Sequence, residues 1–419
     1  MTTRCHRLID ALAPGLRVFV PGFGNESALL GDELRADPGR AQDVTFCALQ
    51  YPGLDRFDYL ALHPRARMES FFMSPVLRRG IAERRADLLP ADYLAMARRL
   101  VEGDPFDVAI AQLSVPDVDG WCRAGLAADF IPLVWPRARR RVAHLNPRVP
   151  RTRGSFRVHV STIDVALEHD AAVPLHADAR PGDVEARIGA RVADLVRDGD
   201  VLQFGIGSVP LAAAGALAAH RRLRLHGGLA TASLRTLWEA GALDRDARIT
   251  TGVLLGDTDL HDFAASLERL WLTDVTETHA SAAILAASQG RRFVAINGAV
   301  EVDLLGQVNA ERANGTLVAG AGGLPAYAQA ALLAPGGRLL VCLPSSAKRG
   351  SASRIVPLLG DRSMCTLPRH LADAIVTEHG CAELRGVGLD ARAEALIGIA
   401  TPAHRSGLAD AWSRLRATL

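Results

Sequence analysis

Residues 293–311 read FVAINGAVEVDLLGQVNAE, and the glycine cluster Gly320-Ala321-Gly322-Gly323 follows them. Apolar residues at 300, 302 and 304 alternate with Glu301 and Asp303, which is the period of a half-buried strand. Gly306 allows a tight turn before a second extended segment. The glycine cluster then offers bare backbone N–H groups for the close approach of a ligand. A purely structural hairpin with a flexible glycine loop fits the same pattern.

Length and periodicity predict two α/β domains, because 419 residues exceed one ordinary core and 49% of them are hydrophobic. Short apolar runs that read as strands alternate with helical segments, which favours mostly parallel, open sheets covered on both faces. Periodicity is lost over residues 168–183, where Pro, Ala and Asp accumulate. We therefore expect one domain over residues 1–175 and a second over residues 176–419.

Charge and composition exclude several classes of protein. A net charge of +2 and only 5% aromatic residues argue against nucleic-acid binding. The chain has no run of about 18 apolar residues and no apolar leader, so neither membrane spanning nor export is expected. Six cysteines without a C-x-x-C pair indicate free thiols in a reducing cytoplasm, and 13 histidines without metal-ligand spacing argue against a catalytic metal. Arginine supplies all but one of the basic residues, Lys348, as in proteins from GC-rich bacterial genomes.

A strand, a glycine turn and an apolar helix follow one another over residues 201–219. This order suits an anion, because the free N–H groups and the dipole of a helix N-terminus point outward. The turn also fits a purely structural role in packing. The residues of this segment that we single out are Gln203, Phe204, Gly205, Ile206 and Gly207.

Several motifs, in their order and spacing, resemble the acetyl-CoA hydrolase/transferase family, the class I CoA-transferases that include 4-hydroxybutyrate CoA-transferase. They are AINGAVEVDLLGQV at 295–308, GAGG at 320–323, LPSSAK at 343–348, SRIVP at 353–357, QLSVPDVDG at 112–120 and NPRVPRTRG at 146–154. The resemblance implies two CoA-transferase-type domains with a thioester ligand in the cleft between them. It also implies a homo-oligomer.

The same resemblance implies that coenzyme A, or pantetheine carried on an acyl carrier protein, is the thioester bound. The segment at 203–207, the glycine cluster and the single lysine correspond to the family's CoA-facing positions. The predicted contacts are Gln203, Phe204, Gly205, Ile206, Gly207, Asn297, Gly298, Gly320, Gly322, Gly323 and Lys348.

One position departs from the family pattern. Relatives read H-T-E-M or H-S-E-M, and their glutamate forms a glutamyl-CoA thioester, whereas this chain reads Leu225-His226-Gly227-Gly228. Glycine at 228 has no nucleophile, so covalent catalysis through that residue is impossible. Two further segments also differ from the family: THAS at 278–281 lacks an N-x-P, and LPAY at 324–327 replaces Q-x-D-F.

A thioester cradle without its nucleophile leaves three functions open: hydrolysis by water, direct acyl transfer to a bound acceptor, and binding without catalysis. The first two need a base and an oxyanion site. His226 and Glu301 are the candidate bases, although a core histidine and a structural carboxylate fit them as well. The N–H groups near Gly322 and Gly323 are candidates for the oxyanion site, and Gly227-Gly228 is expected to open space for a water or a larger group. A CoA-transferase that uses Glu301 as its carboxylate is a further alternative.

Overall fold

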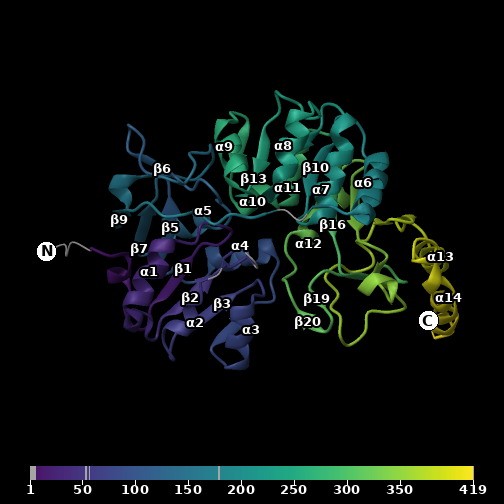
Figure 1. Cartoon of the computed structure of the whole chain (residues 1–419), viewed down its shortest axis with the longest axis horizontal. Helices are drawn as coiled ribbons and strands as arrows, with labels where there is room; N and C mark the ends of the chain where they lie inside the picture. The colour runs from purple at the N-terminus through teal and green to yellow at the C-terminus, as the bar shows by residue number, and fades with distance from the viewer. Residues whose placement is uncertain (1–5, 52–53, 56, 178–179, 419) are drawn as a thin grey trace. The chain divides into compact units, whose positions relative to one another are not determined.

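The computed structural model describes residues 6–51, 54–55, 57–177 and 180–418 (Figure 1). The chain forms two compact units. The first unit contains residues 1–177 and 248–278, and the second contains residues 178–247 and 279–419. The chain therefore returns to the first unit after it has begun the second.

A seven-stranded sheet is the centre of the first unit, and all of its neighbouring strands are parallel. In spatial order the strands are β4 (Ala86–Leu88), β3 (Arg67–Ser70), β2 (Thr45–Ala48), β1 (Arg17–Val20), β5 (Val108–Leu113), β7 (Arg140–Leu145) and β9 (Val165–Glu168). All six residues of β5 are buried, as in a parallel sheet with both faces covered. The helices between the strands are α1 (Ala28–Ala36), α2 (Tyr59–Leu62), α3 (Pro75–Ala82), α4 (Tyr93–Glu102) and α5 (Ile131–Val134).

Two carboxylates hold the loop that follows β1. Asp55 accepts hydrogen bonds from the backbone N–H groups of Phe23, Gly24 and Tyr51 at 2.8, 3.1 and 2.7 Å. Glu26 accepts one from the hydroxyl of Tyr59 at 3.2 Å. Burial, together with the nearby Glu26 carboxylate, raises the pKa of Asp55 to about 7.

The returning segment completes the first unit. It contains β13 (Ile249–Thr251), β14 (Val253–Leu254), α9 (Thr258–Ser266), β15 (Leu270–Leu272) and α10 (Val275–Thr278). Leu272 donates its N–H to Arg153 O at 2.8 Å and accepts from Ser155 N at 2.9 Å. A Cβ at Gly154 would lie 2.2 Å from Leu272 O, so only glycine permits this approach. The NPRVPRTRG motif therefore ends at the docking point of the returning segment.

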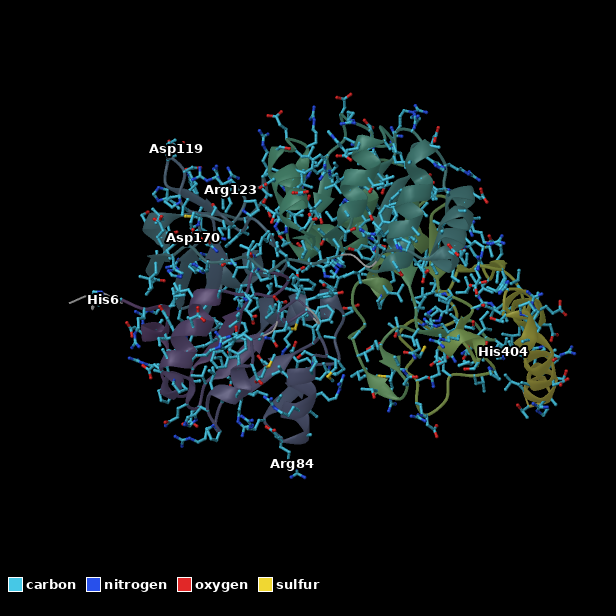
Figure 2. All side chains as sticks on the ribbon, in the orientation of Figure 1. His6, Arg84, Asp119, Arg123, Asp170 and His404 are labelled. Atoms are coloured by element: carbon cyan, nitrogen blue, oxygen red, sulfur yellow. The ribbon has the colours of Figure 1, made fainter. Side chains whose placement is uncertain are left out.

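The two loop motifs of the first unit also contact each other. Asn146 donates from Nδ2 to Gln112 Oε1 at 3.0 Å, and Arg151 donates from a guanidinium nitrogen to Pro116 O at 3.1 Å. Beside them, β6 (Trp121–Arg123) and β8 (Arg157–His159) form an antiparallel hairpin. Asp119 and Arg123, labelled in Figure 2, mark this part of the chain.

A six-stranded sheet is the centre of the second unit. In spatial order it contains β11 (Arg224–Leu225), β10 (Val201–Phe204), β16 (Phe293–Gly298), β21 (Arg338–Cys342), β25 (Ala374–Thr377) and β26 (Gly380–Glu383). Its strands are parallel except β26, which is antiparallel at one edge. The helices of this unit are α6 (Asp183–Leu195), α7 (Ser208–Ala216), α8 (Ala232–Glu239), α11 (Ser281–Ser288), α12 (Leu324–Leu333), α13 (Leu389–Gly398) and α14 (Arg405–Arg416). The fold prediction of open, mostly parallel α/β sheets is confirmed.

The hairpin predicted at 300–309 is present. Its strand β17 (Glu301–Asp303) pairs antiparallel with β18 (Val308–Asn309) and parallel with β24 (Ile355–Val356). Gly306 has φ +88°, the left-handed conformation that favours glycine. The alternation fails at Asp303, which is fully buried because it accepts hydrogen bonds from the N–H groups of Leu305 and Gln307 at 3.1 and 2.9 Å. Asp303 thus closes the turn from inside.

Charged side chains are spread over both units (Figure 2). Cys47, Cys122, Cys342, Cys365 and Cys381 are free thiols, and Cys5 lies outside the described residues. In the part of the chain that the structure describes, no helix has both the length and the apolar character needed to cross a membrane.

Candidate functional site

The glycine turn after β10 has the geometry of a helix N-terminus open to a ligand. Gly207 is the N-cap of α7 with φ +116°, and nothing lies within 4 Å of the point where its Cβ would be. The first N–H groups of a helix have no acceptor within the helix. Phe204 ends the strand with its side chain buried, and Ile206 is half-buried in the turn. The strand, glycine turn and helix that the sequence predicts in this segment are therefore present.

Gln203 and Asn297 meet at the ends of the neighbouring strands β10 and β16. The Nδ2 of Asn297 donates to Gln203 Oε1 at 2.8 Å, and Gln203 Nε2 donates to Asn297 Oδ1 at 3.3 Å. A Cβ at Gly205 would lie 2.9 Å from Asn297 Oδ1, which explains glycine at that position. Gly298 ends β16 and is exposed. Sequence reasoning placed these residues in one site, and the sheet brings them together.

The space beside Gly228 is occupied. A Cβ there would lie 2.7 Å from Cε1 and 3.0 Å from Nε2 of His279, and 3.0 Å from the hydroxyl oxygen of Tyr327. At Gly227, a Cβ would meet Gln203 Cγ at 3.0 Å. The expectation that Gly227-Gly228 opens room for a water or a larger group is therefore wrong, because these three side chains occupy that room.

His279 and Tyr327 come from different elements, and their rings form a tilted contact, here called the His–Tyr pair. His279 lies two residues before α11, and Tyr327 lies in the first turn of α12. Their ring centroids are 4.8 Å apart at an interplanar angle of 33°. Both side chains are almost fully buried, at 2% and 3% exposure. Burial, together with nearby His226, lowers the pKa of His279 to about 3, so its imidazole is neutral at physiological pH.

The glycine cluster at 320–323 passes directly over the pair. A Cβ at Gly323 would lie 2.6 Å from Tyr327 Cε2 and 2.8 Å from His279 Nε2. Gly322 has φ +61° and open space where its Cβ would be, and Gly320 is half-buried. Gly323 therefore packs against the His–Tyr pair, whereas Gly322 faces open space.

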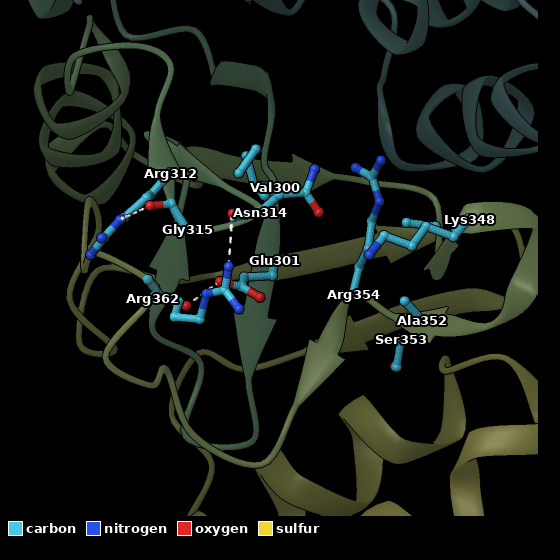
Figure 3. Close-up of a pocket in the computed structure, with 13 residues that line it drawn as sticks. Val300, Glu301, Arg312, Asn314, Gly315, Lys348, Ala352, Ser353, Arg354 and Arg362 are labelled. Atoms are coloured by element: carbon cyan, nitrogen blue, oxygen red, sulfur yellow. Dashed lines mark hydrogen bonds between the residues drawn. The ribbon is translucent and has the colours of Figure 1, made fainter. Parts of the chain in front are cut away.

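A cationic pocket of about 350 Å³ lies in the second unit (Figure 3). Its basic residues are Arg312, Lys348, Arg354 and Arg362, and its one carboxylate is Glu301. Arg312 donates to Gly315 O at 3.1 Å and Arg362 to Asn314 O at 3.2 Å, so backbone carbonyls orient both guanidinium groups. Four cations against one carboxylate make the pocket suitable for an anion.

Lys348 and Glu301 lie in this pocket in different settings. The residues at 348, 349 and 350 have φ of 49°, 56° and 91°, a left-handed turn that is costly at Lys348 and Arg349. Such a turn presents the Lys348 side chain to the pocket. The Oε1 of Glu301 accepts hydrogen bonds from Asn309 Nδ2, at 2.8 Å, and from Ser363 Oγ. His226 is not among the residues that line this pocket.

Sequence reasoning missed the His–Tyr pair as a unit. Both residues lie in segments noted only for departing from the family pattern, 278–281 and 324–327. A Cβ at the third such departure, Gly228, would lie within 3.0 Å of both side chains. All three departures from the family pattern could be read in the sequence. Their closeness in space could not, because nothing in the three separate stretches indicates it.

Among the described residues, no group of three or more His, Cys, Asp or Glu side chains is placed to hold a metal ion.

Comparison with known proteins shows the family. Residues 256–412 match the model described as the acetyl-CoA hydrolase/transferase C-terminal domain. The chain is 33% identical over 354 residues to the 4-hydroxybutyrate coenzyme A transferase of Clostridium kluyveri, covering 82% of this chain and 81% of that protein. The chain belongs to the acetyl-CoA hydrolase/transferase family.

Solved structures have the same fold. A 4-hydroxybutyrate CoA-transferase from Porphyromonas gingivalis superposes with a TM-score of 0.79 at 26% identity, over 98% of this chain and 96% of that one. RipA from Yersinia pestis has the same fold, with a TM-score of 0.90 at 24% identity over 98% and 96% of the two chains.

Proposed function

We propose that this protein processes an acyl thioester of coenzyme A, or of pantetheine on an acyl carrier protein, without a glutamyl-CoA intermediate. The acyl group passes to water or directly to a bound acceptor. The single observation that carries the proposal is the His–Tyr pair beside Gly228, the position where the resemblance predicts the family's glutamate. Since an imidazole and a phenol fill the space that a side chain at 228 would need, no carboxylate fits there.

Two features support a thioester of this kind as the ligand. The turn at Gly205–Gly207 and the glycine cluster offer backbone N–H groups, which suit phosphate and thioester oxygens. The cationic pocket, which Lys348 helps to line, suits the phosphate groups of coenzyme A or of a carrier-bound pantetheine. His226, adjacent to Gly227-Gly228, is the proposed base.

A mass-spectrometric assay in ¹⁸O-water tests the proposal. The purified protein is offered a panel of acyl-CoA thioesters, with and without acetate. Label in the released acid, with no CoA on acetate and no CoA adduct on the protein, supports hydrolysis; the rate should fall in His226→Ala. CoA transferred to acetate through a protein-bound adduct refutes the proposal. Thioesters left intact, with CoA still bound, indicate a binding protein.

A second candidate is a CoA-transferase that uses Glu301 as its carboxylate. What favours it is the place of Glu301 in the cationic pocket with Lys348 and Arg354. Since Oε1 accepts two hydrogen bonds, attack would come from Oε2. In this case CoA moves to acetate, and Glu301→Gln abolishes the transfer.

A further inference from the structure

The basic residues of the cationic pocket have no ion-pair partners. Elsewhere in the second unit arginines pair with carboxylates, as Arg292 does with Asp200 at 2.7 Å. In the described part of the chain, none of the pocket's four cations forms such a pair. Like charges that share one pocket repel each other. An anion with more than one charge relieves this repulsion, and a phosphomonoester carries about 1.5 to 2 negative charges at pH 7.

A short hairpin holds one wall of the pocket in place (Figure 3). It spans residues 312–317, which pair antiparallel around the turn at Asn314 and Gly315. The backbone carbonyls of this turn accept hydrogen bonds from Arg312 and Arg362. A Cβ at Gly315 would lie 2.7 Å from Arg362 Nε, so only glycine lets that guanidinium lie against the turn. Two guanidinium groups are thus positioned before a ligand arrives.

Lys348 and Arg354 supply the remaining positive charge of the pocket. Neither side chain makes a hydrogen bond or an ion pair with a residue that the structure describes. Arg354 is half-buried, whereas Lys348 is exposed on its left-handed turn. Both side chains are therefore available to a ligand, while the other two cations are already oriented by the backbone.

The carboxylate of Glu301 gives the pocket a second kind of contact. Its Oε1 accepts hydrogen bonds from Asn309 and Ser363, whereas its Oε2 accepts none from the described residues. An ionised carboxylate only accepts hydrogen bonds, so Oε2 repels an anion but binds a hydroxyl. Dinucleotide-binding folds use a carboxylate in this way, on a ribose hydroxyl near the phosphate site. The pocket therefore suits a ligand with a hydroxyl beside its phosphate.

We propose that the cationic pocket binds a phosphorylated ribose, with the phosphomonoester among the four cations and the neighbouring hydroxyl on Glu301 Oε2. Coenzyme A carries this group, a 3′-phosphate beside a free 2′-hydroxyl, whereas pantetheine on a carrier protein has no ribose. The inference rests on the proposed function and names free coenzyme A as the bearer of the thioester. A volume of about 350 Å³ lies near the lower end for ligand pockets, which fits a sugar phosphate rather than a whole cofactor.

Changes in the ligand test the site without altering the protein. Titration calorimetry on the full chain compares CoA with dephospho-CoA, and adenosine 3′,5′-bisphosphate with its 2′-deoxy analogue. Each loses a hydrogen-bonding group that faces a charge, so dephospho-CoA and the 2′-deoxy compound should each bind about tenfold more weakly than their partners. Dephospho-CoA that binds as tightly as CoA overturns the inference. Inorganic phosphate that displaces the bisphosphate, without any preference for CoA over dephospho-CoA, would show that the pocket takes the free ion instead.

A variant of the carboxylate tests its assigned partner. In Glu301→Ala the two bisphosphates should bind equally, and the 2′-deoxy compound should bind at least as tightly as it does to the wild type, because a repelling charge is gone. A merely structural role for Glu301 predicts weaker binding of both compounds. Glu311→Ala is the matched control, since this carboxylate lies on the same stretch of chain but does not line the pocket. A tenfold preference that persists in Glu301→Ala overturns the assignment.

The two proposals fail in different ways, because binding is measured without turnover. A CoA adduct on the protein refutes the proposed function, while the calorimetry still decides whether the pocket binds the ribose. Turnover without an adduct, with the same KM for thioesters of CoA and of dephospho-CoA, leaves the proposed function standing and refutes the ribose site. Glu301→Gln should raise KM for acyl-CoA more than it changes kcat. Loss of kcat at unchanged KM would instead favour the transferase that uses Glu301 and overturn the role inferred here.

Discussion

At the scale of single residues, glycine at 228 and histidine at 279 depend on each other. The imidazole occupies the space into which any side chain at 228 would project. In a close-packed interior such a steric overlap cannot be relieved freely, because neighbouring side chains have little room to move. A carboxylate cannot be restored at 228 by one substitution alone.

Gly228→Ala should therefore lower the free energy of unfolding by about 1–3 kcal/mol, the usual cost of overpacking. Thermal or urea unfolding measures this, and the same substitution in a His279→Ala background should cost much less. Gly215→Ala is the matched control, because a Cβ there meets nothing within 4 Å, and alanine is the better helix former in α7. Equal losses at 228 in both backgrounds would contradict the steric dependence.

Asp55 predicts a pH dependence of stability in the first unit. Its folded pKa of about 7 lies above the ordinary value of 3.8, so the folded state holds the proton while the unfolded state releases it. This contribution is fully present below about pH 4 and is lost as the pH rises to about 7. The Tm of Asp55→Asn minus the Tm of the wild type should accordingly increase between pH 4 and pH 7. A difference that falls over this range would mean that the folded state prefers the carboxylate.

At the scale of elements, α6 supports the helix that carries the glycine turn. Gly189 of α6 lies against the backbone of α7, where a Cβ would come within 2.7 Å of the carbonyl carbon and oxygen of Ala212. Since backbone cannot rotate away as a side chain does, the separation of the two helices is fixed by this glycine.

Gly189→Ala should force α7 outward, lower stability by about 1–3 kcal/mol, and reduce the thermal stabilisation that CoA gives. Differential scanning fluorimetry with and without CoA measures both effects, and Gly215→Ala again serves as the control. If Gly189→Ala lowers stability but CoA still raises the Tm as much as in the wild type, the turn before α7 does not contact the ligand.

The cationic pocket makes a prediction about the part of the ligand that it binds. Lys348→Ala and Arg354→Ala should each weaken CoA binding about tenfold, because a hydrogen bond to a charged group contributes roughly 1.5 kcal/mol. Titration calorimetry should show a smaller effect at high salt and none for pantetheine, which lacks the phosphates. Arg414→Ala, an exposed arginine on α14, is the control. If the two variants weaken pantetheine binding as much as CoA binding, the CoA phosphates bind outside this pocket.

The sequence predicted those parts of this architecture that depend on local pattern. The strand, glycine turn and apolar helix predicted over residues 201–219 became β10, the turn at Gly205–Gly207 and α7, since each of them is read from adjacent residues. β3 and β4 were not predicted, because their short runs mix exposed and buried positions. The His–Tyr pair was not predicted either, because nothing in the stretch around 279 indicates which residue of α12 will lie against it.

At the scale of the whole molecule, the chain crosses between its two units three times. Leu270, Leu272 and Val275 of the returning segment are buried in the first unit. A fragment of residues 1–177 should therefore fail to give a cooperative unfolding transition. The same fragment joined by a flexible linker to residues 248–278 should give one. Circular dichroism during heating distinguishes the two, and a cooperative transition in the shorter fragment would contradict the expectation.

Gly154, where Leu272 docks, also determines when the first unit can be completed during biosynthesis. Translation delivers residues 178–247 before the segment that the first unit still lacks. While the ribosome makes that stretch, the backbone around Gly154 lacks the contacts that Leu272 makes with it. The nascent chain thus carries two unfinished units at once, and slow elongation before residue 278 prolongs the period in which a chaperone would have to shield them.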